Sequence, residues 1–261
     1  TYTNSNGCVS SVTTTVTINA LPTVAAITGT TSVCEGATTA LADVTSGGVW
    51  TSSNTATATV NASTGVVTGV AAGSATITYT VTSINGCSTS VTTTVTVNAI
   101  PVVAAISGTT EVCAGSTTSL TSATTGGTWS SSNTAVATVN ASTGVVTGVA
   151  AGSATITYTV TTNGCTSNAQ ATVTVNALPV LASIGGTTNA CVGSTTTLTN
   201  TTSGGVWTSS ATAVATVNTI TGTVTGVSAG TSTITYTYTN SNGCVSSVTT
   251  TVTINALPTV A

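Results

Sequence analysis

The sequence predicts an all-β fold built as a linear array of tandem β-sandwiches. Three observations predict it: the text of the chain repeats at a nearly constant step, Val and Ile alternate with Thr over long stretches, and turn residues interrupt these stretches. Alternation with a period of two is typical of half-buried strands, and β-branched residues disfavour helix. Turn signals at roughly ten-residue spacing favour a sandwich.

The repeat is marked by residues of several kinds that keep the same step. The four prolines stand at positions 22, 101, 179 and 258, and the Asn-Gly-Cys turns keep this step and end at Cys8, Cys87, Cys165 and Cys244. Residues 1–25 return unchanged at 237–261, so three units make one super-repeat. Such periodicity indicates one domain per unit. We expect the chain to be part of a longer array.

The periodic markers also predict the domain boundaries. We expect residue 1 to fall inside a domain, because a lone hairpin arm is not stable without its missing strands. The expected segments are the last strands of a preceding repeat at 1–20, repeat 1 at 21–99, repeat 2 at 100–177, repeat 3 at 178–256 and a linker to the next repeat at 257–261. The preceding copy would supply the missing strands, either in one polypeptide or by strand addition between subunits.

Each unit is expected to hold about seven strands. In repeat 1, "ADVTSGGVWTSS" reads as a strand, a Gly-Gly turn and a second strand, and "TATATVNASTGVVTGVAAG" reads as two short strands. "ATITYTVT" and "SVTTTVTVN" then form a long hairpin, because Asn85-Gly86 between them tolerates positive φ. The unit ends at Asn98, and "AIPVVAAI" is expected to be an extended linker. One tryptophan per unit is expected in the core: Trp50, Trp129 and Trp207.

Composition excludes several classes of function. The chain has no Lys, Arg or His, and its only charged side chains are Glu35, Asp43 and Glu111, for a net charge of −3. Without cations it lacks the electrostatic term for binding nucleic acid or anionic lipid. No apolar run approaches the roughly 18 residues of a membrane helix. We therefore expect no nucleic-acid partner and no membrane insertion within these residues.

The stretch "WSSSNTAVATVNASTGVVTGVAAGSATITYTV" at 129–160 resembles the group 2 bacterial immunoglobulin-like repeat of invasin- and intimin-type surface proteins. Repeats 1 and 3 carry versions of it that begin at Trp50 and Trp207. The resemblance implies an immunoglobulin-like sandwich and a role as spacer or stalk. The cysteine pair in each unit departs from the plain family pattern. It is similar to repeats of very large secreted surface proteins of gliding bacteria.

The cysteines allow two pairings if the fold is immunoglobulin-like. Each unit has one cysteine before its first turn ("VCEG", "VCAG", "ACVG") and one after its last hairpin. These two positions would lie at opposite ends of a sandwich, about eight residues of roughly 3.3 Å apart, beyond the roughly 7 Å limit between bridged Cα atoms. Bridges between neighbouring units avoid this separation.

Both pairings and a third state stay open at this point. The pairing between units joins Cys34 with Cys165 and Cys113 with Cys244, and leaves Cys8, Cys87 and Cys191 to adjacent copies. The pairing within units joins Cys34 with Cys87, Cys113 with Cys165 and Cys191 with Cys244. The third state leaves thiols free. Disulfides indicate an oxidising, extracellular or cell-surface setting.

Catalysis and metal binding find little support in the residue types. General acid–base chemistry needs His, Lys or paired carboxylates, whereas the three acids here occupy non-equivalent positions. We expect Glu35 to be a solvated turn residue, because the sister units hold Ala114 and Val192 there. Neither a CxxC motif nor a carboxylate cluster is present for zinc or calcium. We expect no enzyme activity, no cofactor and no metal.

Three functions remain from different classes. A structural fibre segment that associates with itself explains the near-identical units and the low net charge, which favours association. A stalk or binding region of an adhesin that recognises surface glycans is the alternative, and it would need exposed aromatic side chains. Ice binding is a third, because "TVT" and "TIT" rows resemble Thr-x-Thr arrays, although any alternating strand of this composition would show them.

Overall fold

The computed structural model describes residues 1–258, so the last three residues of the expected linker at 257–261 lie outside the described part. The all-β prediction is confirmed: residues 1–258 form strands β1–β26, with no helix among them and hence none that could cross a membrane. By their contacts they form two compact units, residues 1–102 with 161–167, and residues 103–160 with those from 168 onward.

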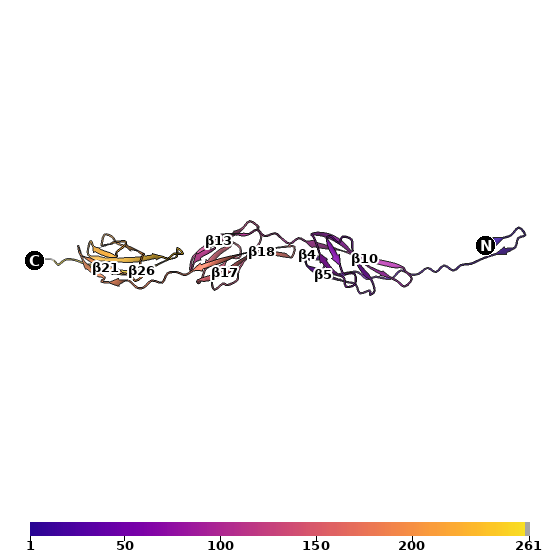
Figure 1. Ribbon diagram of the computed structural model, residues 1–261, viewed down its shortest axis with the longest axis horizontal. Coiled ribbons are helices and arrows are strands. Elements are labelled where there is room, and N and C mark those ends of the chain that lie inside the picture. The colour runs from indigo at the N-terminus through magenta and orange to yellow at the C-terminus, as the bar shows by residue number, and fades with distance from the viewer. Residues whose placement is uncertain (259–261) are drawn as a thin grey trace. The chain divides into compact units, whose positions relative to one another are not determined.

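Residues 28–98 fold into the sandwich of repeat 1, in which Figure 1 labels β4, β5 and β10. Its strands are β3 (Thr28–Gly29), β4 (Ser32–Cys34), β5 (Thr38–Ala42), β6 (Val49–Ser52), β7 (Ala58–Val60), β8 (Val66–Gly69), β9 (Gly73–Thr82) and β10 (Ser88–Asn98). One sheet has the order β4-β10-β9-β6 and the other β3-β5-β8-β7. The first strand is thus split between the two sheets, which gives eight segments where about seven were expected.

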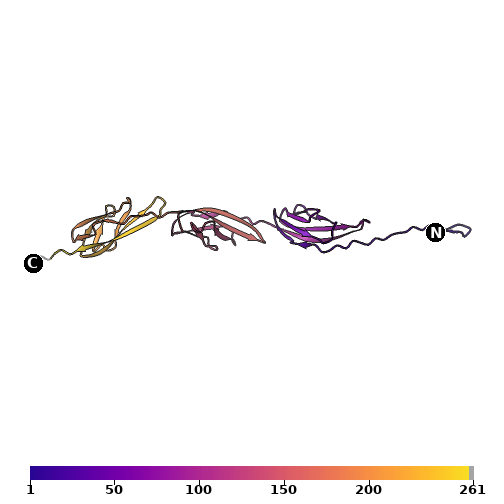
Figure 2. The same cartoon turned by 90° about the horizontal axis from the view of Figure 1, so that it is seen from below.

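Repeats 2 and 3 have the same topology, and Figure 2 shows their strands in two layers. In repeat 2 the strands are β11 (Ile106–Gly108), β12 (Glu111–Cys113), β13 (Thr117–Ser122), β14 (Thr128–Ser131), β15 (Ala137–Val139), β16 (Val145–Gly148), β17 (Gly152–Thr162) and β18 (Cys165–Asn176). In repeat 3 they are β19 (Gly185–Gly186), β20 (Asn189–Cys191), β21 (Thr195–Thr199), β22 (Val206–Ser209), β23 (Ala215–Val217), β24 (Thr223–Gly226), β25 (Gly230–Thr239) and β26 (Val245–Asn255).

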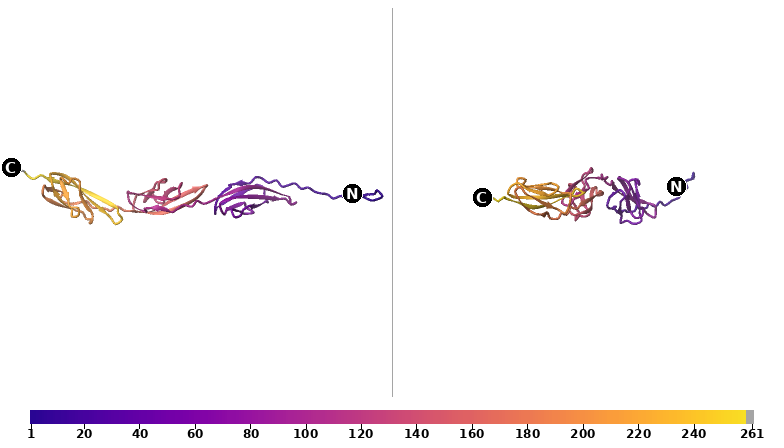
Figure 3. Two further views of the ribbon diagram at one scale, coloured as in Figure 1. Left: turned by 90° about the horizontal axis from the view of Figure 1, so that it is seen from above. Right: turned by 60° about the vertical axis from the view of Figure 1, so that its left-hand side comes forward.

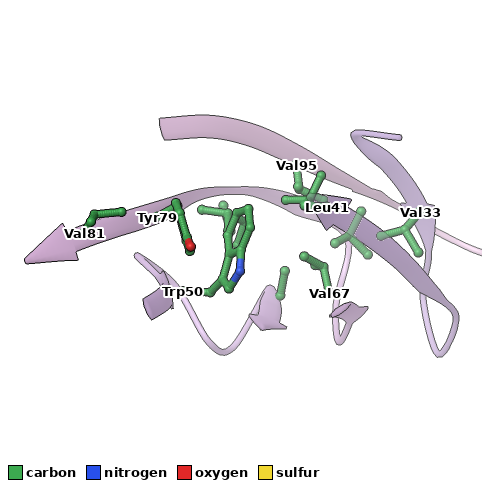
Figure 4. Close-up of a cluster of buried hydrophobic side chains, with 11 residues drawn as sticks. Val33, Leu41, Trp50, Val67, Tyr79, Val81 and Val95 are labelled. Carbon is green, nitrogen blue, oxygen red and sulfur yellow. The ribbon is translucent and has the colours of Figure 1, made fainter. Parts of the chain in front are cut away.

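A buried Trp–Tyr pair lies at the centre of each core. In repeat 1 the rings of Trp50 and Tyr79 have centroids 4.5 Å apart, and side chains from both sheets surround them (Figure 4). The Tyr79 hydroxyl donates to the carbonyl of Thr45 at 2.6 Å and accepts from the amide of Gly48 at 2.8 Å. These two bonds satisfy the buried hydroxyl and hold the loop that crosses from β5 to β6. The pairs Trp129–Tyr158 and Trp207–Tyr236 repeat the arrangement.

The Gly-Gly turn of repeat 1 has a steric explanation at both positions. Gly47 has φ +83°, a conformation that side chains rarely adopt. At Gly48 a Cβ would lie 2.3 Å from the Tyr79 ring. The tyrosine can therefore reach this loop only because the second residue has no side chain.

The expected linker "AIPVVAAI" needs correction in its second half. Val103 and Ile106 pack against the core of repeat 2, and Val24 and Ile27 pack in the same way in repeat 1. These side chains are half-buried, whereas Ala26 and Ala105 beside them are exposed. The free linker therefore ends at about Val102.

Residues 1–19 have the same sequence as residues 237–255 but lie in a different environment. Strands β1 (Tyr2–Thr3) and β2 (Val9–Ser10) pair Tyr2 with Ser10, the register of the identical hairpin later in the chain. The segment that follows lies outside the sandwich of repeat 1 in both views of Figure 3. Val16 and Ile18 are 80% and 93% exposed, whereas their identical counterparts in β26 are at most 2% exposed.

Equivalent positions directly after β5 and β21 differ in one hydrogen bond. Asn200 donates from Nδ2 to the carbonyl of Ala182 at 2.8 Å and accepts at Oδ1 from the amide of Thr202. Asp43 holds the same place in repeat 1 and accepts from the Thr45 amide at Oδ1. Its Oδ2 is buried without a hydrogen-bond partner among residues 1–258. A buried oxygen without a partner costs about 1–3 kcal/mol.

We predict that Asp43→Asn stabilises repeat 1, because the new amide can donate a hydrogen bond as Asn200 does. The expected gain is about 1 kcal/mol, seen as slower hydrogen exchange of the β5, β8 and β9 amides. Asn200→Asp is the matched control and should lower protection in repeat 3 by a similar amount. Unchanged exchange in both variants would contradict the assignment.

Candidate functional site: the disulfide-bridged junctions

The chemistry-bearing side chains of this chain are its cysteines, and the structure joins four of them. Cys34 is bonded to Cys165, with Cα atoms 5.7 Å apart, and the bridge encloses 131 residues of sequence. Cys113 is bonded to Cys244 at a Cα separation of 5.6 Å and over the same sequence distance. Each bridge connects the first strands of one repeat to the last hairpin of the next.

The register of the strands explains why the bridges join neighbours. In repeat 1, β4 pairs in parallel with the end of β10, which places Cys34 opposite Asn98, where the chain leaves the sandwich. The β9–β10 hairpin pairs Thr82 with Ser88 at its tip and Val97 with Gly73 at its far end. Cys87 therefore lies at the opposite end of the sandwich from Cys34. The strand geometry that favours bridges between units is present in the structure.

The first junction, between Cys34 and the tip of the β17–β18 hairpin, also contains polar contacts. The Asn98 side chain donates from Nδ2 to the Ser32 hydroxyl at 2.8 Å and to the Asn163 carbonyl at 3.3 Å. The Asn98 carbonyl oxygen lies 3.8 Å from the sulfur of Cys165. One asparagine thus contacts its own repeat and the incoming hairpin.

The second junction, between Cys113 and the tip of the β25–β26 hairpin, has a related but different set of contacts. The carbonyl oxygen of Asn176 lies 3.9 Å from the sulfur of Cys244. Asn240 donates from Nδ2 to the carbonyl of Ala177 at 3.1 Å. Sequence reasoning missed these asparagines. Asn176 belongs to the Asn-Ala pair that ends every unit, and this repeated pair is the signal that could have found it.

The other three cysteines carry free thiols in the structure. Cys8 and Cys191 are exposed, and Cys87 is half-buried. The sulfur of Cys87 lies 4.0 Å from the carbonyl oxygen of Asn19, which repeats the relation of Cys165 to Asn98. Cys191 pairs in register with Asn255 as Cys34 does with Asn98. Cys87 and Cys191 therefore hold the two halves of a junction, each without its partner cysteine.

The three acids do not come together in the structure. Glu35 accepts a hydrogen bond at Oε1 from the amide of Ala72 at 2.7 Å and so links the loop after β4 to the loop between β8 and β9, while Glu111 begins the short strand β12. Asp43 lies in the loop between β5 and β6 described above. Among residues 1–258 no group of three His, Cys, Asp or Glu residues lies close enough to hold a metal ion.

The outer face of each long hairpin carries hydroxyl groups. In repeat 1, Thr80 is hydrogen-bonded to Ser90 at 2.8 Å and Thr82 to Ser88 at 2.9 Å. In repeat 3 the register pairs Thr233 with Thr251 and Thr235 with Thr249. The outward residues of these alternating strands therefore give the sandwiches a neutral, hydroxyl-rich surface.

The fold and the junctions together define a class of protein. Paired four-stranded sheets with a first strand split between them, a buried Trp–Tyr pair and repetition along the chain make a set of tandem immunoglobulin-like domains. The family model of the bacterial Ig-like domain (group 2) matches residues 9–92 and 90–175. The chain belongs to this family, as the resemblance in the sequence implied.

Solved structures that resemble the chain are tandem-domain proteins. Domains 1 to 6 of the surface layer protein SbsC share 22% identity over 92% of this chain, with a TM-score of 0.28, and the chain spans 41% of that structure. An I-band fragment of titin shares 10% identity, with 90% and 99% of the two chains covered and a TM-score of 0.33.

A third structure is a SusE-like surface located polysaccharide binding protein from Bacteroides thetaiotaomicron. It shares 11% identity, with 89% of this chain and 61% of that chain covered and a TM-score of 0.34. At these values we draw no functional conclusion from the three structures. Comparison with the sequences of characterised proteins gives no significant match.

We predict that cutting the linker between repeats 1 and 2 leaves the chain covalently connected, because the Cys34–Cys165 bridge spans the cut. A specific protease site inserted between Ile100 and Pro101 provides the cut. The product should run as one band on a non-reducing gel and as two after reduction. The same insertion with Cys34→Ser should give two bands without reductant. Two bands from the parent chain under non-reducing conditions would contradict the bridge.

Proposed function

We propose that this chain is a structural, non-enzymatic segment of an extracellular or cell-surface bacterial fibre. The observation that carries the proposal is the pair of disulfides between successive repeats. In the chain-entropy account, a bridge that closes a loop of this length contributes about 5 kcal/mol to stability. It also links each domain to its neighbour, which a binding module of independent domains does not require.

The setting follows from the same bridges. Disulfides form and persist in oxidising compartments, and reducing conditions in the cytosol would open them. The composition agrees with this setting. The chain has no Lys or Arg, so it offers no cleavage site to trypsin-like proteases. These features support the proposal that the protein acts outside the cytoplasm, in a secreted or surface-attached assembly.

The partner that we propose is a further copy of the same kind of repeat. Val16 and Ile18 are exposed here, while the identical residues of β26 are buried in a complete sandwich. The unpaired thiols of Cys87 and Cys191 lie where Cys165 and Cys34 are bridged. Repeat 3 retains its own last strand, β26, so strand addition from another subunit would have to displace an identical strand.

The alternative, an adhesin region that binds surface glycans, has less support. Sugar-binding surfaces use exposed aromatic rings, whereas the three tryptophans are at most 7% exposed. Tyr238 packs partly against the core of repeat 3. Tyr2, its copy near the start of the chain, is exposed together with the rest of that hairpin.

We predict that an antibody raised against this chain labels filaments outside cells that express the full-length protein. Immunogold electron microscopy of intact, unpermeabilised cells gives the readout, with cells lacking the gene as the control. Label confined to the cytoplasm, or to globular particles, would contradict the proposal.

A second prediction concerns self-association. The purified chain has a net charge of −3 over 261 residues, so charge repulsion between copies is weak. We expect light scattering at physiological salt to show assemblies larger than a monomer. Because free Cys87 and Cys191 supply the two halves of a junction, oxidation should increase the size, and Cys87→Ser with Cys191→Ser should remove that increase. A dispersed monomer under all conditions would contradict the expectation.

A further inference from the structure

We propose that the disulfides divide the chain into two continuous covalent lines that carry tension along the array, and leave the middle strands of every repeat outside both lines. The first line is residues 8–34 and 165–191, joined by the Cys34–Cys165 bridge. The second line is residues 87–113 and 244–258, joined by the Cys113–Cys244 bridge. The inference rests on the proposed fibre function, because it concerns a load along the array.

Each line consists of the same parts. It enters through a hairpin cysteine, follows the last strand of a repeat, crosses the linker and ends at the first-strand cysteine of the next repeat. The first line follows β18 over its 12 residues from Cys165 to Asn176 and continues through the linker to Cys191 at the end of β20. The second line follows β10 from Ser88 to Asn98 and continues to Cys113 at the end of β12. The backbone of the strands and linkers is already extended, so tension can lengthen these segments only slightly.

The two lines are also hydrogen-bonded to each other once in every repeat. β4 of the first line pairs in parallel with β10 of the second, and β12 of the second pairs in parallel with β18 of the first. In repeat 3, β20 of the first line pairs in parallel with β26 of the second. Because each pairing is parallel, both lines run in the same chain direction, and tension in either one can pass to the other by shear along these ladders.

The remaining residues lie off both lines. They are residues 35–86, 114–164 and 192–243, and they contain β5–β9, β13–β17 and β21–β25 together with the buried Trp–Tyr pairs. Each of these segments starts after a first-strand cysteine and ends at the last hairpin. The disulfide bridges let each covalent line bypass these segments. Unfolding a middle segment therefore does not lengthen either line.

The bridges therefore limit how far this chain can be stretched. In the chain with Cys191 unpaired, residues 113–165 connect one line to the other when the two termini are pulled apart. The shortest covalent route then uses residues 1–34, 113–165 and 244–261, about 105 residues or roughly 370 Å at about 3.5 Å each. Without the bridges the full 261 residues would extend to roughly 910 Å. Reduction should therefore lengthen the fully stretched chain about 2.5-fold.

Single-molecule force spectroscopy on the full chain, held by fused terminal handles, tests the proposal. The oxidised chain should stop extending at less than half of the length that it reaches in reductant. Cys34→Ser with Cys113→Ser should reach the full length without reductant. The matched control, Cys8→Ser with Cys191→Ser, removes two unpaired cysteines and should behave as the parent chain.

A pair of insertions separates a line from the segments off it. Twenty Gly and Ser residues inserted between Leu21 and Pro22 lie on the first line and should lengthen the oxidised, stretched chain by about 70 Å. The same insertion between Ser46 and Gly47 lies off both lines and should add nothing until the bridges are reduced. Equal lengthening by both insertions in the oxidised chain would overturn the proposal. That result would not decide the proposed fibre function, which the immunogold experiment tests separately. Immunogold labelling reports where the protein is located and does not depend on which residues carry tension.

Discussion

The structure depends on a three-residue parallel pairing between the first and the last strand of each repeat. This pairing places Cys34 opposite Asn98, so the first-strand cysteine lies at the point where the chain leaves the sandwich. The next repeat must begin there, and its last hairpin returns to the same place because its long strands run the full length of the domain. A cysteine at the tip of that hairpin then needs no rearrangement to form a bridge. The same pairing prevents a bridge within the repeat.

Because of the composition, disulfide bridges are a more important source of stability here than in an ordinary protein. Without Lys, Arg or His the chain cannot form ion pairs between side chains, and its outward strand faces carry hydroxyl groups. Domains of about 80 residues bury a limited core, in this case a Trp–Tyr pair surrounded by Val, Ile and Leu. Disulfides supply stability that depends on neither charge nor core size. They act between domains, so that each repeat is tied to its neighbour.

Much of this fold could be predicted from the sequence because its signals are local. Period-two alternation and Asn-Gly turns predict the long hairpins, and strand order with chain geometry favours the bridges between units that the structure contains. What could not be predicted depends on contacts between distant residues. The free oxygen of Asp43 becomes visible only beside the equivalent bond from Asn200 to Ala182. The inward packing of Val103 and Ile106 needed the position of the core.

The repeated text shows this limit within one molecule. Residues 247–254 lie in the strand β26, while the identical residues 11–18 form no strand. Valine and threonine give both copies the same preference for extended backbone, so the difference comes from the neighbours that one copy has and the other lacks. For this chain, a strand predicted from the sequence therefore forms only where the rest of its domain is present.

The middle repeat has a shorter last hairpin than its neighbours. Asn163 and Gly164 form a two-residue turn with both φ values positive, whereas Ser83 to Cys87 and Asn240 to Cys244 close longer loops. The missing residue accounts for the one step between units that is shorter than the others. It lies at the hairpin tip, where Asn163 contacts Asn98, and so changes one kind of junction in three. In a long array built from this super-repeat, every third junction would differ from the other two. The array would then have a structural period of three domains.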